Sequence, residues 1–447
     1  MKAFKAYDIR GEWEIDFNAE DVYRIGFFLP GILKANTILV GRDLRHSSDT
    51  VFNALSRGIT DAGANVHDAG LCTTPLIYWA TGHYNYKGSV MITASHNPKN
   101  HNGLKVSGAG VMPVGYENGL RDLEYLVENN NITPSEIKGQ IQKIEPQSEY
   151  LRFLKSYVNP LSNIRVGIDC SNGMAALFVK QLIGNEPFYI NDTADGSFPG
   201  HEPNPLEPEN QEQIKELVIK KLCDIGLIFD GDADRVMFID EKGNFVSPDL
   251  MIALLGHFFF EIQGRNGIVL QDIRSSKAIG EYLQQFGAEV ETWRVGRAYA
   301  ASKLREINGL YGGELAGHYY FRDFYYSDSG LMAALIVLGL VDQFKAKGIS
   351  LSQLIQKISP YHNSGEINFK VEAKQDAIQA VVDYFASKEK PQRMLTFDGV
   401  RLDYPTFWLN IRPSNTEPYL RFIAESVNQE ELRFLIQKTK EIIATFK

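Results

Sequence analysis

Cysteine is scarce in this chain of 447 residues, and no two cysteines form a C-x-x-C pair. Cys72, Cys170 and Cys223 are an odd number of widely separated thiols, which does not fit a disulfide framework or a dithiol redox motif. The first residues, 'MKAFKAYDIRGEWEIDF', also lack the apolar core of a secretory signal. We therefore expect a cytoplasmic protein with reduced thiols.

Long apolar runs and an excess of positive charge are missing as well. The most apolar segment, 'LMAALIVLGLV' from Leu331, is much shorter than the roughly 20 residues that cross a bilayer, so it predicts a buried helix. Lys and Arg total 46 against 55 Asp and Glu, for a net charge of −9. This balance argues against nucleic acid or a membrane as the main partner, but a few local Arg residues can still bind a small anion.

An internal repeat is present instead. Each copy has an apolar strand, an acidic residue among small polar ones, a helix and a second short strand. The copies are 'TILVGRDLRHSSDTVFNALSRGITDAGANVHDAG', 'RVGIDCSNGMAALFVKQLIGNEPFYIN' and 'GIVLQDIRSSKAIGEYLQQFGAEVETWRVG'. The acidic residues are Asp43, Asp169 and Asp272. Strand–helix–strand segments of this length are βαβ units, and three copies predict three related α/β domains, unless the likeness only reflects what all such units share.

A polar loop follows another apolar strand downstream of each copy. The loops are 'ITASHNPKNHNG', 'IGLIFDGDADR' and 'GLYGGELAGHYYF'. Because open α/β sheets bind ligands where strands give way to loops, we expect the loops to converge on one cleft. From about Gly365 the pattern changes to a smaller α+β domain. The predicted fold is thus three similar α/β domains with mixed sheets and a C-terminal α+β domain around a central cleft, with limits at 1–148, 149–252, 253–361 and 362–447.

The loop 'DGDADR' places three carboxylates, Asp230, Asp232 and Asp234, directly after an apolar strand. Clustered carboxylates repel one another unless a cation neutralises them, and oxygen ligands suit Mg²⁺ or Ca²⁺. An EF-hand is excluded because its sixth position, which needs Gly, is Arg235 and because a strand precedes the loop. A metal site is favoured over an acidic surface turn, and Arg235 indicates an anion bound beside the metal.

The stretch 'SVMITASHNPKNHNGLK' holds more hydrogen-bonding side chains than a surface turn needs. Ser95 lies outside any G-x-S-x-G elbow, which disfavours that type of hydrolase. A serine that carries a phosphoryl group fits better, because Mg²⁺ and Arg side chains stabilise phosphoryl transfer. His96 and Lys105 could then position phosphate or move a proton. The alternative is a structural role for this amide-rich loop.

Three further segments carry weaker signals. 'RPSNTEP', from Arg412, has the composition of a phosphate cradle but also fits a turn bounded by prolines. 'GGELAGHYYF' presents Glu314 and His318, and a carboxylate is a common ligand for sugar hydroxyls, although a structural Glu fits this loop equally well. 'KAYDIRG', with Tyr7 and Arg10, is uninformative by itself.

Taken in order, 'YDIRG', 'TASHNPKNHNGLK', 'DGDADR', 'GGELAGH' and 'RPSNTEP' resemble the α-D-phosphohexomutase superfamily over the whole chain. Within it they look most like bacterial phosphomannomutase and phosphomannomutase/phosphoglucomutase enzymes. The resemblance implies an isomerase in which phosphorylated Ser95, with the three aspartates, holds Mg²⁺. The serine would pass its phosphoryl group to a hexose phosphate through a hexose 1,6-bisphosphate, which also serves as activator. Arg10, His96 and Lys105 would assist proton movement and hold the transferring group.

The resemblance also implies a substrate-binding set: Tyr7, Arg235, Arg274, Arg297, Glu314, His318, Arg412, Ser414, Asn415 and Thr416. Ala316 stands where the family usually has Ser, and Arg297 where many relatives have His. Arg274 stands where some relatives carry Lys. The expected function is phosphomannomutase, with phosphoglucomutase, or a sugar-phosphate-binding protein without turnover, as alternatives. The expected partner is a small hexose phosphate, and the chain is expected to be a monomer or homodimer.

Overall fold

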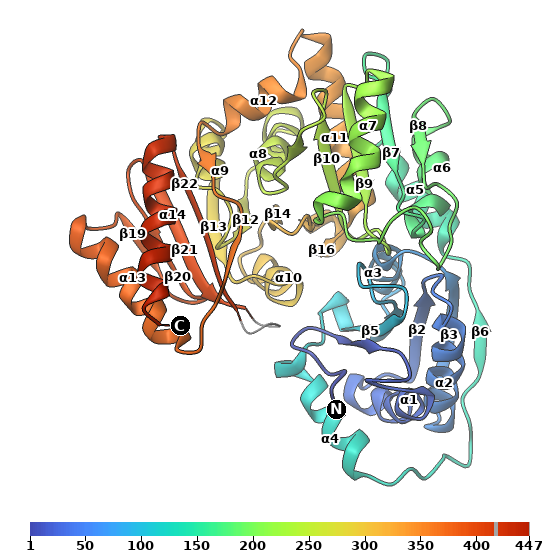
Figure 1. Ribbon diagram of the computed structural model, residues 1–447. Coiled ribbons are helices and arrows are strands. Elements are labelled where there is room, and N and C mark those ends of the chain that lie inside the picture. Colours follow the sequence, from blue (N-terminus) through green and yellow to red (C-terminus); the bar gives the residue numbers. More distant parts are fainter. Residues whose placement is uncertain (415–418, 447) are drawn as a thin grey trace.

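Four β-sheets organise the computed structural model, which describes residues 1–414 and 419–446. They follow one another along an arc, from the blue N-terminal sheet to the red C-terminal one (Figure 1). The first sheet has the order β1-β5-β4-β2-β3-β6. Its strands are β1 (Ile9–Glu12), β2 (Thr37–Arg42), β3 (Asn65–Leu71), β4 (Gly88–Ile92), β5 (His101–Gly108) and β6 (Ile141–Lys143). Its helices are α1 (Ala19–Leu33), α2 (Ser48–Asp61), α3 (Thr74–His83) and α4 (Leu120–Asn129).

The second sheet has the order β11-β10-β9-β7-β8. Its strands are β7 (Val166–Asp169), β8 (Phe188–Ile190), β9 (Ile225–Phe229), β10 (Val236–Asp240) and β11 (Phe245–Val246). The accompanying helices are α5 (Gln147–Lys155), α6 (Val179–Ile183) and α7 (Glu212–Lys221). The helix predicted for the second repeat is short here: a 3₁₀ turn, Met174–Leu177, precedes α6, and Gly184, with φ of 92°, ends it.

The third sheet has the order β13-β12-β14-β15-β16. Its strands are β12 (Ile268–Asp272), β13 (Glu289–Trp293), β14 (Tyr311–Gly313), β15 (Tyr319–Phe321) and β16 (Ser327–Asp328). The helices of this part are α8 (Leu250–Gly256), α9 (Ala278–Leu283), α10 (Arg297–Glu306), α11 (Gly330–Ala346) and α12 (Leu351–Ile358). The predicted buried helix is α11, and its residues from Gly330 to Asp342 are all buried. In the part of the chain that the structure describes, no helix has the length and apolar character that crossing a bilayer requires.

The fourth sheet is antiparallel, with the order β17-β22-β21-β20-β19 and with β18 beside β22. Its strands are β17 (His362–Asn363), β18 (Ile367–Lys370), β19 (Arg393–Leu395), β20 (Val400–Asp403), β21 (Phe407–Pro413) and β22 (Tyr419–Ser426). Two helices, α13 (Lys374–Lys388) and α14 (Gln429–Ala444), pack with it around a separate apolar core. The predicted fold class, three α/β units and one α+β unit, is confirmed. The predicted domain limits stay a prediction.

The three α/β units repeat one local turn. The strand-ending aspartate accepts a hydrogen bond from the backbone N–H two residues later: Arg45 to Asp43 at 3.1 Å, Ser171 to Asp169 at 2.8 Å and Arg274 to Asp272 at 2.6 Å. An aspartate that bonds its own backbone in this way makes a compact turn at the strand end. The repeat seen in the sequence is therefore also a repeat in hydrogen bonding.

The first three units are joined by one continuous apolar cluster. It includes Trp79 of α3, Phe229 of β9 and Leu335 of α11. Parallel pairing joins β2 to β4 and β7 to β9, so the loops after β4 and β9 leave corresponding ends of their sheets. Because protein interiors are close-packed, this shared core fixes the positions of those loops relative to one another.

Candidate active site

The three aspartates lie in the turn between β9 and β10, directly after β9, whose residues are all buried. Asp230, Asp232 and Asp234 have no solvent exposure, and one carboxylate oxygen of each lies within 4.8 Å of the others. Oδ1 of Asp232 and Oδ1 of Asp234 are buried without a hydrogen-bond partner among the described residues. Buried unpaired carboxylate oxygens are costly, and an oxygen-only cluster of this size fits Mg²⁺.

The electrostatics of this triad are set by burial and by Lys105. Burial, followed by the neighbouring carboxylates, raises the pKa of Asp230 and of Asp234. Burial acts in the same direction on Asp232, but the Lys105 ammonium and the Thr74 hydroxyl outweigh it and lower the pKa of that carboxyl. Nζ of Lys105 lies 2.7 Å from Oδ2 of Asp232 and also hydrogen-bonds Asp234. Lys105 thus neutralises part of the charge that a metal ion would neutralise.

Ser95 from the first unit lies at this triad in the second. Its Oγ donates a hydrogen bond to Oδ2 of Asp230 at 2.8 Å, and the residue is almost fully buried. Its backbone has φ of 52°, in the left-handed region that a non-glycine residue seldom adopts. Arg45 helps to hold this conformation, because its Nη2 donates to the Ser95 carbonyl at 2.8 Å. Nδ1 of His96 lies 3.4 Å from the same Oγ.

Two arginines complete the positive side of the Ser95 region. Arg235 donates from Nε to Oδ2 of Asp230 at 3.2 Å, its Nη2 lies 3.4 Å from Oγ of Ser95, and it also contacts His96. Burial, reinforced by the charge of Arg10, lowers the pKa of Arg235 to about 10. Arg10 donates to Oδ1 of Asn97 at 3.1 Å and pairs with Asp8. Cations around a buried serine hydroxyl suit the charge that develops in phosphoryl transfer.

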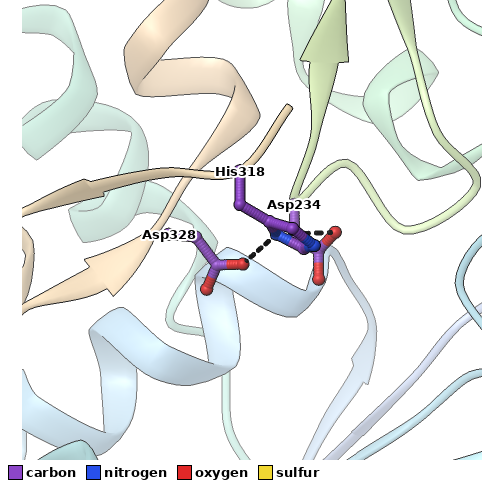
Figure 2. A group of neighbouring side chains, drawn as sticks. All are labelled: Asp234, His318 and Asp328. Atoms are coloured by element: carbon purple, nitrogen blue, oxygen red, sulfur yellow. Dashed lines mark hydrogen bonds and ion pairs between the residues drawn. The ribbon is translucent and has the colours of Figure 1, made fainter. Parts of the chain in front are cut away.

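The third unit contributes Glu314 and His318. Glu314 is buried, which raises its pKa, and the hydroxyl of Tyr320 donates to its Oε1 at 2.6 Å. Nδ1 of His318 lies 2.6 Å from Oδ2 of Asp328 and 3.8 Å from Oδ1 of Asp234 (Figure 2). A backbone bridge between Arg235 and His318 joins the second and third units. The predicted sugar-binding loop thus meets the predicted metal loop.

Three predicted arginines occupy fixed positions in ion pairs. Arg297 of α10 donates from Nε to Oδ1 of Asp328 at 3.0 Å. Arg274 pairs with Asp272 at 2.8 Å, and its Nη1 lies 3.9 Å from Glu366 of the fourth unit. Arg412 of β21 lies 3.8 Å from that same carboxylate. The carboxylate of Glu366 therefore links the two arginines across the third and fourth units.

Two further predicted residues, Tyr7 and Ser414, lie at the edges of this network. The hydroxyl of Tyr7 donates to the carbonyl of Val295 at 3.2 Å, which joins the first and third units. The backbone N–H of Ser414 donates to the carbonyl of Tyr419 at 2.9 Å. Asn415 and Thr416 lie outside the described residues.

A chain of contacts runs through the site from one end to the other. Ser95 bonds Asp230 in the buried triad, Asp234 of the triad lies by His318, and the loop of His318 holds Glu314. Oε2 of Glu314 is 4.0 Å from Nη2 of Arg274, which leads through Glu366 to Arg412. The structure thus brings loops of all four units into one network.

Several residues of this network were not singled out in the sequence. They are Thr74, Tyr78, Asp328, Glu366 and Asp398. Asp328 had a usable signal, because 'YYSDSG' places a carboxylate among aromatic and small residues just before a buried helix. The others carry no local signal, since each contacts a partner outside its own segment of the chain.

Four family models match consecutive parts of the chain. The phosphoglucomutase/phosphomannomutase alpha/beta/alpha domains I, II and III match residues 1–128, 148–243 and 247–361, and the C-terminal domain matches residues 366–441. The chain belongs to the phosphoglucomutase/phosphomannomutase family. The resemblance found in its motifs is therefore confirmed.

Curated relatives match nearly the whole chain. A phosphomannomutase of Escherichia coli K12 is 35% identical, with 95% of each chain covered. A phosphomannomutase of Vibrio cholerae is 34% identical, with 100% of this chain and 98% of the relative covered. Proteins of Xanthomonas campestris named phosphohexose mutases are also 34% identical, with 99% and 98% covered.

Solved structures share the fold at lower sequence identity. A phosphoglucomutase/phosphomannomutase family protein of Burkholderia thailandensis superposes with a TM-score of 0.89 at 23% identity, covering 99% of this chain and 97% of that chain. A Thermus thermophilus protein described as a phosphomannomutase superposes with a TM-score of 0.81 at 22% identity, covering 99% of this chain and 98% of that chain. These two comparisons support the four-unit architecture alone.

Proposed function

We propose that the protein is a Mg²⁺-dependent phosphomannomutase that interconverts mannose 1-phosphate and mannose 6-phosphate, with Ser95 as the phosphoryl carrier. The observation that carries the proposal is the 2.8 Å hydrogen bond from Oγ of Ser95 to Asp230 inside a buried triad of carboxylates. A buried serine beside a metal-type cluster and two arginines has the groups that phosphoryl transfer needs. Relatives named phosphomannomutase, at 34–35% identity over nearly the full length, support the choice of sugar.

In the proposed reaction the phosphoryl group on Ser95 moves to the free hydroxyl of a hexose monophosphate. The bond between phosphorus and Oγ of Ser95 breaks and a bond to the sugar oxygen forms. The proton of the sugar hydroxyl passes to His96, and Oγ of Ser95 takes up a proton, for which the Lys105 ammonium would be a donor. The resulting hexose 1,6-bisphosphate returns its other phosphoryl group to Ser95, which leaves the isomeric monophosphate. Arg10 and Arg235 offset the charge on the transferring group.

Mg²⁺ would be held by Asp230, Asp232, Asp234 and Ser95, where it supplies charge neutralisation for the transferring phosphoryl group. Unpaired oxygens on two of the aspartates support this assignment. Added hexose 1,6-bisphosphate would activate the enzyme by phosphorylating Ser95 in molecules that have lost the group.

The sugar and its second phosphate would lie along the rest of the network. Glu314 and His318 would accept sugar hydroxyls, with Tyr7 and Arg297 bordering the same space. The proposed phosphate ligands are Arg274, Arg412, Ser414, Asn415 and Thr416, and the pairing of Arg274 and Arg412 with one carboxylate supports this grouping for the two arginines. The two arginines can bind phosphate once it replaces that carboxylate as their partner.

The only partner in this proposal is the small-molecule substrate. A net charge of −9 argues against nucleic acid as a ligand. Cys72, Cys170 and Cys223 are free and buried, which supports a reducing, cytoplasmic location. We propose a monomer or homodimer as the active form.

A phosphoglucomutase is the second candidate, because Ala316 and Arg297 depart from the family pattern in the region assigned to the sugar. The test is an assay with Mg²⁺ and a trace of glucose 1,6-bisphosphate on mannose 1-phosphate and glucose 1-phosphate side by side. Turnover of mannose at least comparable to glucose supports the proposal. A strong preference for glucose favours the second candidate, and no turnover of either points to a sugar-phosphate-binding protein without activity.

A further inference from the structure

We propose that Asp234, His318 and Asp328 form a second metal site, which takes a transition metal ion such as Zn²⁺ and shares Asp234 with the Mg²⁺ triad. The three donor atoms come from three separate segments: the β9–β10 turn, the residue before β15, and β16. All lie within 4.8 Å of one another. Figure 2 shows the imidazole of His318 between the two carboxylates. Only the assignment of Asp234 to Mg²⁺ rests on the proposed function.

The spacing of the donor atoms fits a tetrahedral ion. Nδ1 of His318 is 2.6 Å from Oδ2 of Asp328 and 3.8 Å from Oδ1 of Asp234. Tetrahedral Zn²⁺ with bonds of roughly 2.0–2.1 Å places its ligand atoms about 3.3 Å apart. These two distances lie on either side of that value, and the donor atoms of Asp234 and Asp328 are within 4.8 Å of each other. Side-chain rotations that move the donor atoms by about 1.5 Å or less would complete the geometry.

An unpaired oxygen points to a ligand at this position. Asp234 has no solvent exposure, and its Oδ1 has no hydrogen-bond partner among the described residues. Nδ1 of His318 and Nε of Arg235 each lie 3.8 Å from this oxygen, beyond hydrogen-bond distance. A buried carboxylate oxygen without a hydrogen bond is costly, and coordination to a cation removes that cost.

The second oxygen of each carboxylate is already held by a cation. Lys105 hydrogen-bonds Oδ2 of Asp234, and Arg297 donates to Oδ1 of Asp328 at 3.0 Å. The oxygens left over are the ones that face His318. Outer hydrogen bonds of this kind orient metal ligands. The positive charges also weaken the attraction for a divalent ion, so we expect an exchangeable site with one open position and not a closed structural one.

Ligand chemistry separates the two sites. The Mg²⁺ triad offers oxygen alone, whereas the second site adds an imidazole nitrogen, which favours Zn²⁺ and Co²⁺ over Mg²⁺. Because both sites need Asp234, occupation of the second site weakens Mg²⁺ binding. It also takes His318 away from the sugar. Zn²⁺ should therefore inhibit the enzyme, and excess Mg²⁺ should relieve the inhibition.

A comparable histidine elsewhere provides a control. Nε2 of His201 lies 3.0 Å from Oδ2 of Asp169, and its side chain, 7% exposed, is more buried than that of His318, which is 13% exposed. No third metal-type donor joins this pair among the residues that the structure describes. His201→Gln therefore removes a buried histidine–aspartate contact without touching a three-donor group.

The experiment is a Co²⁺ titration of the metal-free full-length protein, followed by visible absorption. Co²⁺ with an imidazole ligand and four or five ligands in all absorbs strongly, whereas Co²⁺ in an oxygen-only octahedral site absorbs weakly. We expect strong bands at one equivalent in the wild type, in His201→Gln and in Asp230→Asn, which damages the triad alone. His318→Gln should lose the bands, and Asp328→Asn should weaken Co²⁺ binding at least about tenfold.

Bands that persist in His318→Gln, or weak absorption by the wild type, would overturn the site. Circular dichroism checks the fold of each variant. If His318→Gln does not fold, the Co²⁺ affinity of Asp328→Asn tests the site instead. The titration uses no substrate, so it remains decisive if the mutase assay fails. In that case the second metal site would still be supported by the titration, and only the predicted inhibition by Zn²⁺ would be withdrawn.

Discussion

Arg297 and His318 bind opposite oxygens of one buried carboxylate, that of Asp328. Arg297 is held on its other side by Tyr78 of the first unit, because its Cζ lies 3.8 Å from the centre of that ring. Burial acts to raise the pKa of Asp328, but the charge of Arg297 and the hydrogen bond to His318 outweigh it and lower that pKa. This arginine therefore fixes the aspartate that positions His318, and joins the first and third units.

Arg297→Gln should destabilise the protein, because it leaves Asp328 buried with one cation fewer. Breaking a buried ion pair costs about 3–5 kcal/mol in unfolding free energy. Denaturant unfolding of the variant against the wild type measures this. The control is Arg265→Gln, which breaks the partly exposed pair with Asp323 and should cost less than about 1 kcal/mol. Equal decreases in unfolding free energy in the two variants would show that the buried Arg297–Asp328 pair stabilises the protein no more than the exposed one.

Ser95→Ala should reduce mutase turnover by about three orders of magnitude or more, because no other side chain replaces a removed nucleophile. The structure offers Ser107→Ala as a matched control. Ser107 of β5 is also buried in the first sheet, and its Oγ has no hydrogen-bond partner among the described residues. Steady-state rates on mannose 1-phosphate decide the matter, and Ser95→Ala with normal turnover would end the proposal of a phosphoserine.

The strand ends were predictable from the sequence, because their signals are local. An apolar strand followed by Asp230 and two more aspartates at alternate positions needs no distant information. The helix of the second repeat was harder to predict from the sequence. This helix is interrupted because the turn before it packs against the metal loop: a side chain at Gly173 would meet the carbonyl oxygen of Gly231 at 2.7 Å.

The supporting residues could not be predicted in the same way. Tyr78 and Arg297 are more than two hundred positions apart, and neither segment has a sequence pattern that predicts the contact. Glu366 likewise has a role only because the fourth sheet places it between Arg274 and Arg412. Such roles depend on tertiary packing, which periodicity and spacing do not encode. Sequence motifs thus predicted the reacting groups, and the structure shows which residues contact them.

Lys105→Met should destabilise the metal-free protein and increase the stabilisation gained from Mg²⁺. The variant leaves Asp232 and Asp234 without their cation, at a cost of about 3 kcal/mol or more. A metal ion that binds the folded state alone raises its stability by mass action. Melting temperatures with and without Mg²⁺ test this.

Lys303→Met is the control for the Lys105 variant, because it breaks a pair with the exposed Glu306. It should leave both melting temperatures almost unchanged. If Lys105→Met shows no larger response to Mg²⁺ than the wild type, then the ammonium and the metal do not neutralise the same carboxylates.

His201 should make stability depend on pH. Its loop lies between the first two units: Arg45 lies 5.1 Å above the ring of Phe198, and the N–H of Gly200 donates to Asn172 at 3.0 Å. Burial acts to lower the pKa of His201, but the hydrogen bond to Asp169 outweighs it and raises the pKa above its usual value. The protonated form therefore binds its partner best in the folded protein.

The sign of the effect follows from linkage. Because the pKa is higher in the folded state, the contribution of His201 is complete below the unfolded value of about 6.5 and is lost as the pH rises through the folded value. The melting temperature of His201→Gln should therefore fall below that of the wild type most at acidic pH, and the gap should narrow as the pH rises. His67→Gln, which removes an imidazole bonded to the Tyr86 hydroxyl at 2.6 Å, controls for the loss of a histidine. A gap that stays constant from acidic to basic pH would mean that charge on His201 does not hold this loop.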